Sequence, residues 1–137
     1  MFPKDINILV VDDMVGMRKL IKSQLLELGY RNVSETENGK VAYSTVVEKH
    51  ASGTPFGLIL SDWNMPVMTG IEFLKKVRAN PDVKKTPFLL ITAEGEARQV
   101  LEAIRLGVSD YIVKPFTPAI FKAKFELVWK KHNSPPA

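Results

Sequence analysis

The sequence contains no cysteine among its 137 residues. Disulfide bonds and thiolate metal sites are therefore excluded, and a reducing compartment imposes no constraint on the chain. No apolar run approaches the roughly 18–20 residues that a membrane-spanning helix needs, and residues 1–5 lack the apolar stretch of a signal peptide. We therefore expect a cytoplasmic protein with no membrane partner.

Internal repeats, low-complexity tracts and a linker rich in proline, glycine or serine are also missing. The length is close to that of one ordinary domain, and a hydrophobic share of 45% is enough for a real core. We therefore expect a single domain over residues 1–132 and a short disordered tail over residues 133–137.

The sequence has only a small excess of positive charge: 19 lysines and arginines against 15 acidic residues give a formal net charge of +4. A basic excess can mark a nucleic-acid-binding protein. Here the basic side chains are scattered among acidic ones, and no basic run of five occurs. The pattern indicates an ordinary solvated surface and predicts no nucleic-acid partner, although the excess could help to attract an acidic protein.

Short, apolar, β-branched runs alternate with stretches of helical periodicity along the whole chain. This alternation is typical of an α/β protein with a parallel sheet, and right-handed crossovers favour a doubly wound, five-stranded sheet with five helices. The predicted strands lie at residues 6–11, 32–36, 56–60, 87–91 and 110–113. The predicted helical faces begin near residues 17, 39, 71, 97 and 118.

Charged and polar side chains directly follow four of these strands. In a doubly wound sheet, ligands bind outside the carboxyl ends of the strands, so these side chains should meet at one edge. They are Asp12 and Asp13 after the first strand, Asp62 after the third, Thr92 after the fourth and Lys114 after the fifth.

The three carboxylates would repel one another unless a cation joined them. A site of oxygen atoms without histidine or cysteine suits a hard cation, and Mg²⁺ fits best because it combines one or two carboxylates with water and a phosphate oxygen. Beside such a cation, a carboxylate can act as a nucleophile toward a phosphoryl group. Lys114 would then supply positive charge and Thr92 a hydroxyl donor.

Each of these residues also has an ordinary structural interpretation. Asp12 and Asp13 could cap the helix that follows them, Thr92 could cap a strand end, and Lys114 could be a surface lysine. Their joint occurrence at four strand ends makes coincidence the poorer explanation.

Four stretches resemble response-regulator receiver domains, and among these the CheY group of chemotaxis receivers. They are residues 8–13, 61–66, 92–94 and 111–117, within a resemblance that extends from about residue 5 to residue 131. The resemblance implies a flavodoxin-like sheet with strand order 2-1-3-4-5.

For the site, the resemblance implies that Asp62 accepts a phosphoryl group. It implies that Asp13, Asp62 and the backbone carbonyl of Asn64 bind Mg²⁺ directly, and that Asp12 holds a metal-bound water. Lys114 occupies the position of the lysine that contacts the phosphoryl group.

For the switch, the resemblance implies that Thr92 moves toward the phosphoryl group and that Tyr111 is the switch aromatic residue. Asn64 and Glu94 match the CheY group and would position the water that removes the phosphoryl group. We therefore expect a short-lived signal.

The chain ends soon after its last predicted helix, so we expect output by binding rather than through a second domain. The resemblance implies a monomer with a chemotaxis-type histidine kinase, a flagellar motor switch protein and a phosphatase as partners. The expected partner face combines the fourth helix, the fifth strand and the fifth helix, with Val100, Ile104, Tyr111, Val113 and Lys124.

Three alternatives remain open from the sequence. A phosphorelay or adaptor receiver, or a phosphate sink for a kinase, would share all the chemistry and differ only in its partner. A phosphohydrolase would need an acid two residues after the nucleophile, where this chain has Asn64; we therefore expect no enzyme activity beyond the protein's own phosphorylation and dephosphorylation. A flavodoxin-like cofactor domain is the poorest fit, because no phosphate-binding loop follows the first strand.

His50 and His132 are expected to be solvated.

Overall fold

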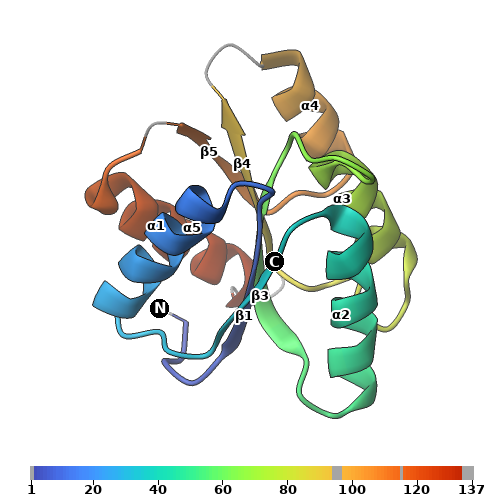
Figure 1. The fold of residues 1–137 in the computed structure, drawn as a ribbon, viewed down its shortest axis with the longest axis horizontal. Helices are drawn as coiled ribbons and strands as arrows, with labels where there is room; N and C mark the ends of the chain where they lie inside the picture. Colours follow the sequence, from blue (N-terminus) through green and yellow to red (C-terminus); the bar gives the residue numbers. More distant parts are fainter. Residues whose placement is uncertain (1, 94–96, 115, 134–137) are drawn as a thin grey trace.

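The computed structural model describes residues 2–93, 97–114 and 116–133, and strands and helices alternate throughout (Figure 1). The five strands are β1 (Asn7–Val11), β2 (Val33–Thr36), β3 (Phe56–Asp62), β4 (Phe88–Ala93) and β5 (Asp110–Lys114). The five helices are α1 (Val15–Glu27), α2 (Gly39–Ala51), α3 (Gly70–Ala79), α4 (Ala97–Arg105) and α5 (Pro118–Asn133). No helix in the described part of the chain is long and apolar enough to cross a bilayer.

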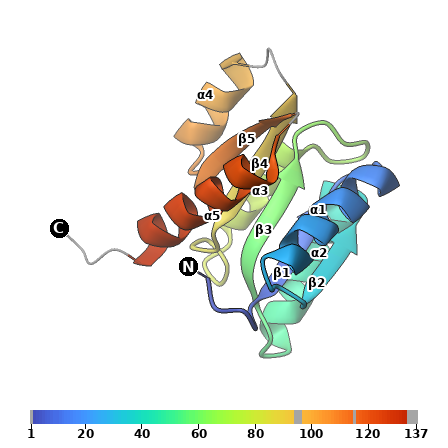
Figure 2. The ribbon, with the colours of Figure 1, turned by 90° about the vertical axis from the view of Figure 1, so that its left-hand side faces the viewer.

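The strands form one parallel sheet in the order β2-β1-β3-β4-β5, which confirms the predicted topology. Helices α1 and α5 cover one face of the sheet, and α2, α3 and α4 lie on the other (Figures 1 and 2). Asp62 pairs with Ile91 across β3 and β4, and Ala93 pairs with Lys114 across β4 and β5. The carboxyl ends of these strands therefore lie at one edge of the sheet.

The inner strands are buried on both faces, which explains their nearly continuous apolar sequence. Successive side chains of a strand point to opposite faces. Leu9 and Val11 of β1 accordingly enter the core under α2, α3 and α4, whereas Ile8 and Val10 enter the core under α1 and α5. Both cores together hold the strand ends in place.

Local capping signals define the ends of several helices. Asn38 accepts a hydrogen bond from the backbone N–H of Val41 at the start of α2. Thr69 and Glu72 form a reciprocal capping box at the start of α3. Thr117 accepts from the backbone N–H of Ile120 at the start of α5, as its sequence position predicts.

The C-terminal helix reaches the boundary of the expected tail. Helix α5 continues to Asn133, so the first residue of the expected tail is helical; residues 134–137 lie outside the described part of the chain. His132 is exposed, as expected, and its Nε2 also lies 2.6 Å from Ser109 Oγ. This contact and the 3.1 Å hydrogen bond from Lys131 Nζ to the carbonyl of Ser109 connect the last turn of α5 to the residue before β5.

Candidate functional site

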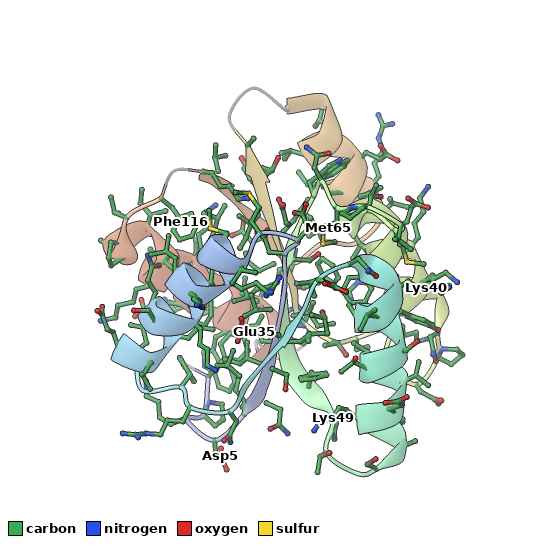
Figure 3. The ribbon with its side chains drawn as sticks, in the orientation of Figure 1. Asp5, Glu35, Lys40, Lys49, Met65 and Phe116 are labelled. Carbon is green, nitrogen blue, oxygen red and sulfur yellow. The ribbon has the colours of Figure 1, made fainter. Side chains whose placement is uncertain are left out.

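Three carboxylates meet at the carboxyl edge of the sheet. Asp12 and Asp13 follow β1 and Asp62 ends β3, and one oxygen of each lies within 4.8 Å of the others. Asp12 is 0% exposed and Asp62 is 7% exposed, whereas Asp13 is open to solvent. Figure 3 shows Met65, in the loop after Asp62, at this edge, and Asp5 and Lys49 at the opposite end. The structure thus brings the three predicted carboxylates together.

Lys114 supplies the positive charge beside them. Its Nζ lies 3.2 Å from Asp62 Oδ1 and 3.6 Å from Asp12 Oδ2. The side chain reaches this position because β5 ends level with the end of β4. One ammonium group therefore pairs with two of the three carboxylates, and the cluster keeps an excess of negative charge.

The electrostatic state of the cluster follows from this imbalance. Burial raises the pKa of Asp12, and the neighbouring Asp13 raises it further. Burial also raises the pKa of Asp62, with the Asp12 carboxylate adding to the effect. Lys114 and backbone N–H donors act in the opposite direction on both groups. An additional cation would relieve the repulsion that remains.

The donor set fits a hard divalent cation. Asp12 Oδ2 is buried and has no hydrogen-bond partner among the described residues. The three convergent side chains offer only oxygen atoms, and one of them is open to water. Mg²⁺ prefers this combination of a few carboxylates and solvent ligands. The cluster is therefore a candidate Mg²⁺ site.

Helix capping does not account for the two aspartates after β1. The N-cap of α1 is Met14, which makes no side-chain capping bond. Asp12 Oδ1 instead accepts a 2.9 Å hydrogen bond from the backbone N–H of Met14, in a local turn just before the helix. This local turn orients Asp12 toward the edge of the sheet.

The loop after β3 fixes the Asp62 carboxylate. The backbone N–H of Trp63 donates to Asp62 Oδ1 at 2.8 Å and to the carbonyl of Ile91 at 3.0 Å. The backbone N–H of Gly70 closes the loop by donating to the carbonyl of Trp63 at 2.9 Å. A Cβ at Gly70 would overlap the Asp62 carbonyl oxygen. Asn64 is exposed in this loop.

The two candidate switch residues lie at different depths. Thr92, which is 1% exposed, follows the residue that pairs with Asp62, and its Oγ1 lies 3.5 Å from the carbonyl of Ala93. Tyr111 is half-buried against the core under α2, α3 and α4, with Lys124 Nζ 4.7 Å from the centre of its ring. Lys124 also pairs with Asp110 at 3.1 Å.

The expected partner face is formed by α4, β5 and α5, which lie on the same side of the molecule (Figure 2). Ile104 is 55% exposed and Val113 is 39% exposed. Val100, Tyr111 and Lys124 are half-buried. Glu94, the second expected dephosphorylation residue, lies outside the described residues.

One residue near the site was not anticipated from the sequence. Arg18 Nη1 donates to the backbone carbonyl of Asp12 at 2.6 Å, and Arg18 Nε lies 3.4 Å from Glu35 Oε1. Arg18 thereby connects α1 and β2 with the end of β1. The sequence feature that could have identified Arg18 is its position in the first turn of α1, where side chains point back toward the start of the helix.

Known proteins match this chain along nearly its whole length. The response regulator receiver domain family matches residues 8–126. Chemotaxis protein CheY1 of Helicobacter pylori is 44% identical over 122 residues, covering 89% of this chain and 95% of that protein. The structure of the chemotaxis response regulator CheY4 of Vibrio cholerae superposes with a TM-score of 0.78 at 34% identity, covering 90% of this chain and 98% of the other.

A receiver domain with a known metal ion also matches. The receiver domain of a sensor histidine kinase from Pseudomonas aeruginosa, whose structure has magnesium coordinated in the active-site cleft, gives a TM-score of 0.77 at 25% identity. The match covers 91% of this chain and 98% of that domain. With the family match and the fold in agreement, this chain belongs to the response-regulator receiver domain family.

Proposed function

We propose that this receiver accepts a phosphoryl group on Asp62 and signals in that state by binding a protein partner. The observation that carries the proposal is the cluster of Asp12, Asp13 and Asp62, with Lys114 Nζ paired to Asp12 and Asp62. It combines a candidate nucleophile, a positive charge and ligands for a divalent cation.

In the proposed reaction, a carboxylate oxygen of Asp62 attacks the phosphorus atom, and the bond from phosphorus to the donor breaks. The donor is the phosphohistidine of a kinase or a small compound such as acetyl phosphate. Lys114 balances the charge on the phosphoryl oxygens.

The metal proposal assigns Asp12, Asp13, Asp62 and Asn64 to Mg²⁺. Magnesium, when bound, would neutralise the carboxylates and the phosphoryl oxygens. The magnesium-containing receiver of Pseudomonas aeruginosa supports this assignment.

The switch proposal follows from the added charge of roughly −1.5 to −2. The Thr92 hydroxyl moves toward the phosphoryl group, and Tyr111 turns into the space that it leaves. This shift favours one state of the face formed by α4, β5 and α5. Asn64 and Glu94 position water for hydrolysis of the aspartyl phosphate, so the signal is brief and the protein acts on no other substrate.

The partner proposal is a chemotaxis-type histidine kinase and the flagellar motor switch, with a phosphatase to shorten the signal. The relatives that are named chemotaxis proteins support it. In this proposal the protein acts in the cytoplasm as a monomer.

Acetyl phosphate labelling tests the phosphorylation proposal. With acetyl phosphate and Mg²⁺, the wild-type protein should gain one base-labile phosphate by intact mass, and Asp62→Asn should gain none. An exposed acid outside the cluster offers a control, because Asp82→Asn should label as the wild type does. Equal labelling of Asp62→Asn would contradict the proposal.

Binding to purified partners separates the motor proposal from the alternative of a phosphorelay or adaptor receiver. Beryllofluoride, which mimics the phosphoryl group, should increase binding to the motor switch protein. Binding that is independent of beryllofluoride, or binding to the kinase alone, would favour the alternative.

A further inference from the structure

A cavity of about 1010 Å³ opens at the amino-terminal ends of the strands, opposite to the carboxylate cluster. Gly57 of β3, Pro87 before β4 and Asp110 of β5 line it. Its other walls come from the N-terminal segment, the turn between α3 and β4, and the last turns of α5. Its volume is enough for one small organic ligand.

The charges that line this cavity are strongly unbalanced. Only one carboxylate of the described chain lines it, that of Asp110, which already pairs with Lys124 at 3.1 Å. Lys84 and Lys85 are exposed and form no ion pair with the described residues. The cationic side chains of the lining are Arg78, Lys84, Lys85 and Lys131.

Arg78 is held in place before any ligand binds. Its Nε donates to the carbonyl of Gly107 at 2.8 Å, and its Nη1 donates to the carbonyls of Lys84 at 2.9 Å and Thr86 at 2.7 Å. Its Nη2 makes no hydrogen bond within the described part of the chain and keeps its donors available. A fixed guanidinium group loses little conformational freedom when it binds an oxyanion.

The positive charge of the cavity affects the pKa of His132. Its Nε2 lies 2.6 Å from Ser109 Oγ, which accepts a hydrogen bond from the backbone N–H of Phe88 at 2.9 Å. Partial burial lowers the pKa of His132, and the charges of Arg78 and Lys131 lower it further. An anion in the cavity would compensate these charges.

An aromatic wall stands beside the cations. Trp129 is half-buried and lines the cavity, with its ring packed edge-on against Phe2 at a centroid distance of 5.2 Å. An indole in this position can stack against a flat ring.

We infer that this cavity binds a small phosphorylated ligand with a flat ring, of mononucleotide chemistry. Its phosphate groups would lie near Arg78, Lys84 and Lys85, and its ring against Trp129. The indole beside the cationic side chains favours a ligand with a flat ring over an acidic peptide. The inference does not depend on phosphorylation of Asp62, because the two sites lie at opposite ends of the strands.

Titration of the full chain with ADP, in EDTA to exclude Mg²⁺, tests the inference by NMR. The indole N–H of Trp129 and the imidazole of His132 should shift saturably, and the apparent pKa of His132 should rise. The other histidine of the chain, His50 on α2, should not respond. Asp62→Asn should bind ADP as the wild type does, so this result is separate from the phosphorylation test.

Two charge-matched variants identify the cavity as the binding site. Lys84→Ala/Lys85→Ala should weaken ADP binding about tenfold, as expected for the loss of two exposed charge contacts. Lys19→Ala/Lys40→Ala removes two exposed lysines elsewhere and should leave the affinity unchanged. Adenosine and inorganic phosphate should each bind more weakly than ADP.

Several outcomes would overturn the inference. These are no saturable shift at millimolar ADP, shifts confined to the region of Asp62, or equal weakening by both double variants. If adenosine bound as tightly as ADP, the phosphate groups would contribute nothing to binding. If inorganic phosphate bound as tightly as ADP, the ring would contribute nothing. Binding of a poly-glutamate peptide in place of ADP would assign the cavity to an acidic partner instead.

Discussion

Lys114 Nζ lies 3.2 Å from Asp62 Oδ1, so the residue proposed to contact the phosphoryl group already pairs with the residue proposed to accept it. Both side chains are largely buried, with relative exposures of 20% and 10%. In this arrangement one ammonium group stabilises the acceptor carboxylate. The same group would also stabilise the negative charge that phosphorylation would add.

Replacing Lys114 should reveal how much the repulsion within the carboxylate cluster destabilises the folded protein. Lys114→Met should lower the free energy of unfolding by about 2 kcal/mol near neutral pH without Mg²⁺, because Asp12 and Asp62 lose their counter-charge. Urea denaturation would measure the loss. Lys19→Met, at an exposed position that forms no ion pair with the described residues, should have little effect.

The same variant should show a defined pH dependence. Because the pKa values of Asp12 and Asp62 are raised on folding, the folded protein holds these protons more tightly than the unfolded chain. Protonation of the two groups therefore adds stability as the pH falls through their raised pKa values toward the ordinary 3.8. The deficit of Lys114→Met relative to the wild type should shrink over this range, and a constant deficit would argue against the electrostatic cause.

Magnesium should stabilise the folded protein through the carboxylate cluster. We expect Mg²⁺ to raise the melting temperature of the wild type and to change the fluorescence of Trp63, which is buried next to Asp62. Asp13→Asn should weaken Mg²⁺ binding about tenfold or more, because it removes an anionic oxygen ligand. Asp82→Asn keeps the cluster intact and should bind Mg²⁺ normally.

Gly70 should tolerate no side chain. A methyl group there would overlap the Asp62 carbonyl oxygen, so Gly70→Ala should destabilise the protein by about 2–3 kcal/mol and slow labelling of Asp62. Gly16 in α1 is the matched control, since an added Cβ meets no atom within 4 Å. Gly16→Ala should stabilise by about 0.5 kcal/mol. Thermal denaturation compares the two, and similar effects of both variants would contradict the steric argument.

Val67 carries backbone strain in the loop between β3 and α3. Its φ is 69°, a left-handed conformation that β-branched residues rarely adopt, and its side chain is 75% exposed. Val67→Asn should therefore raise the free energy of unfolding by about 1 kcal/mol. The control Val47→Asn, on the exposed side of α2, should bring no gain. A loss of stability in Val67→Asn would show that the valine side chain makes a compensating contact.

The sequence by itself determined the fold class, the order of the elements and the residues at the strand ends. Continuous apolar runs such as Ile8–Val11 can only be covered on both faces, and the carboxyl ends of parallel strands share one edge. Asp12, Asp13, Asp62 and Lys114 could therefore be predicted to meet, and the structure brings them together. Their roles in phosphoryl transfer stay predictions.

Only the tertiary structure decided how side chains from distant segments orient toward one another. Local pattern could not show that Arg18 reaches the carbonyl of Asp12, that Lys124 lies over Tyr111, or that His132 joins Ser109. These contacts depend on helix packing and strand register, which no short stretch of sequence specifies. The cationic cavity arises in the same way, because its lining residues are scattered along the chain and meet only when α5 packs beside the start of β5.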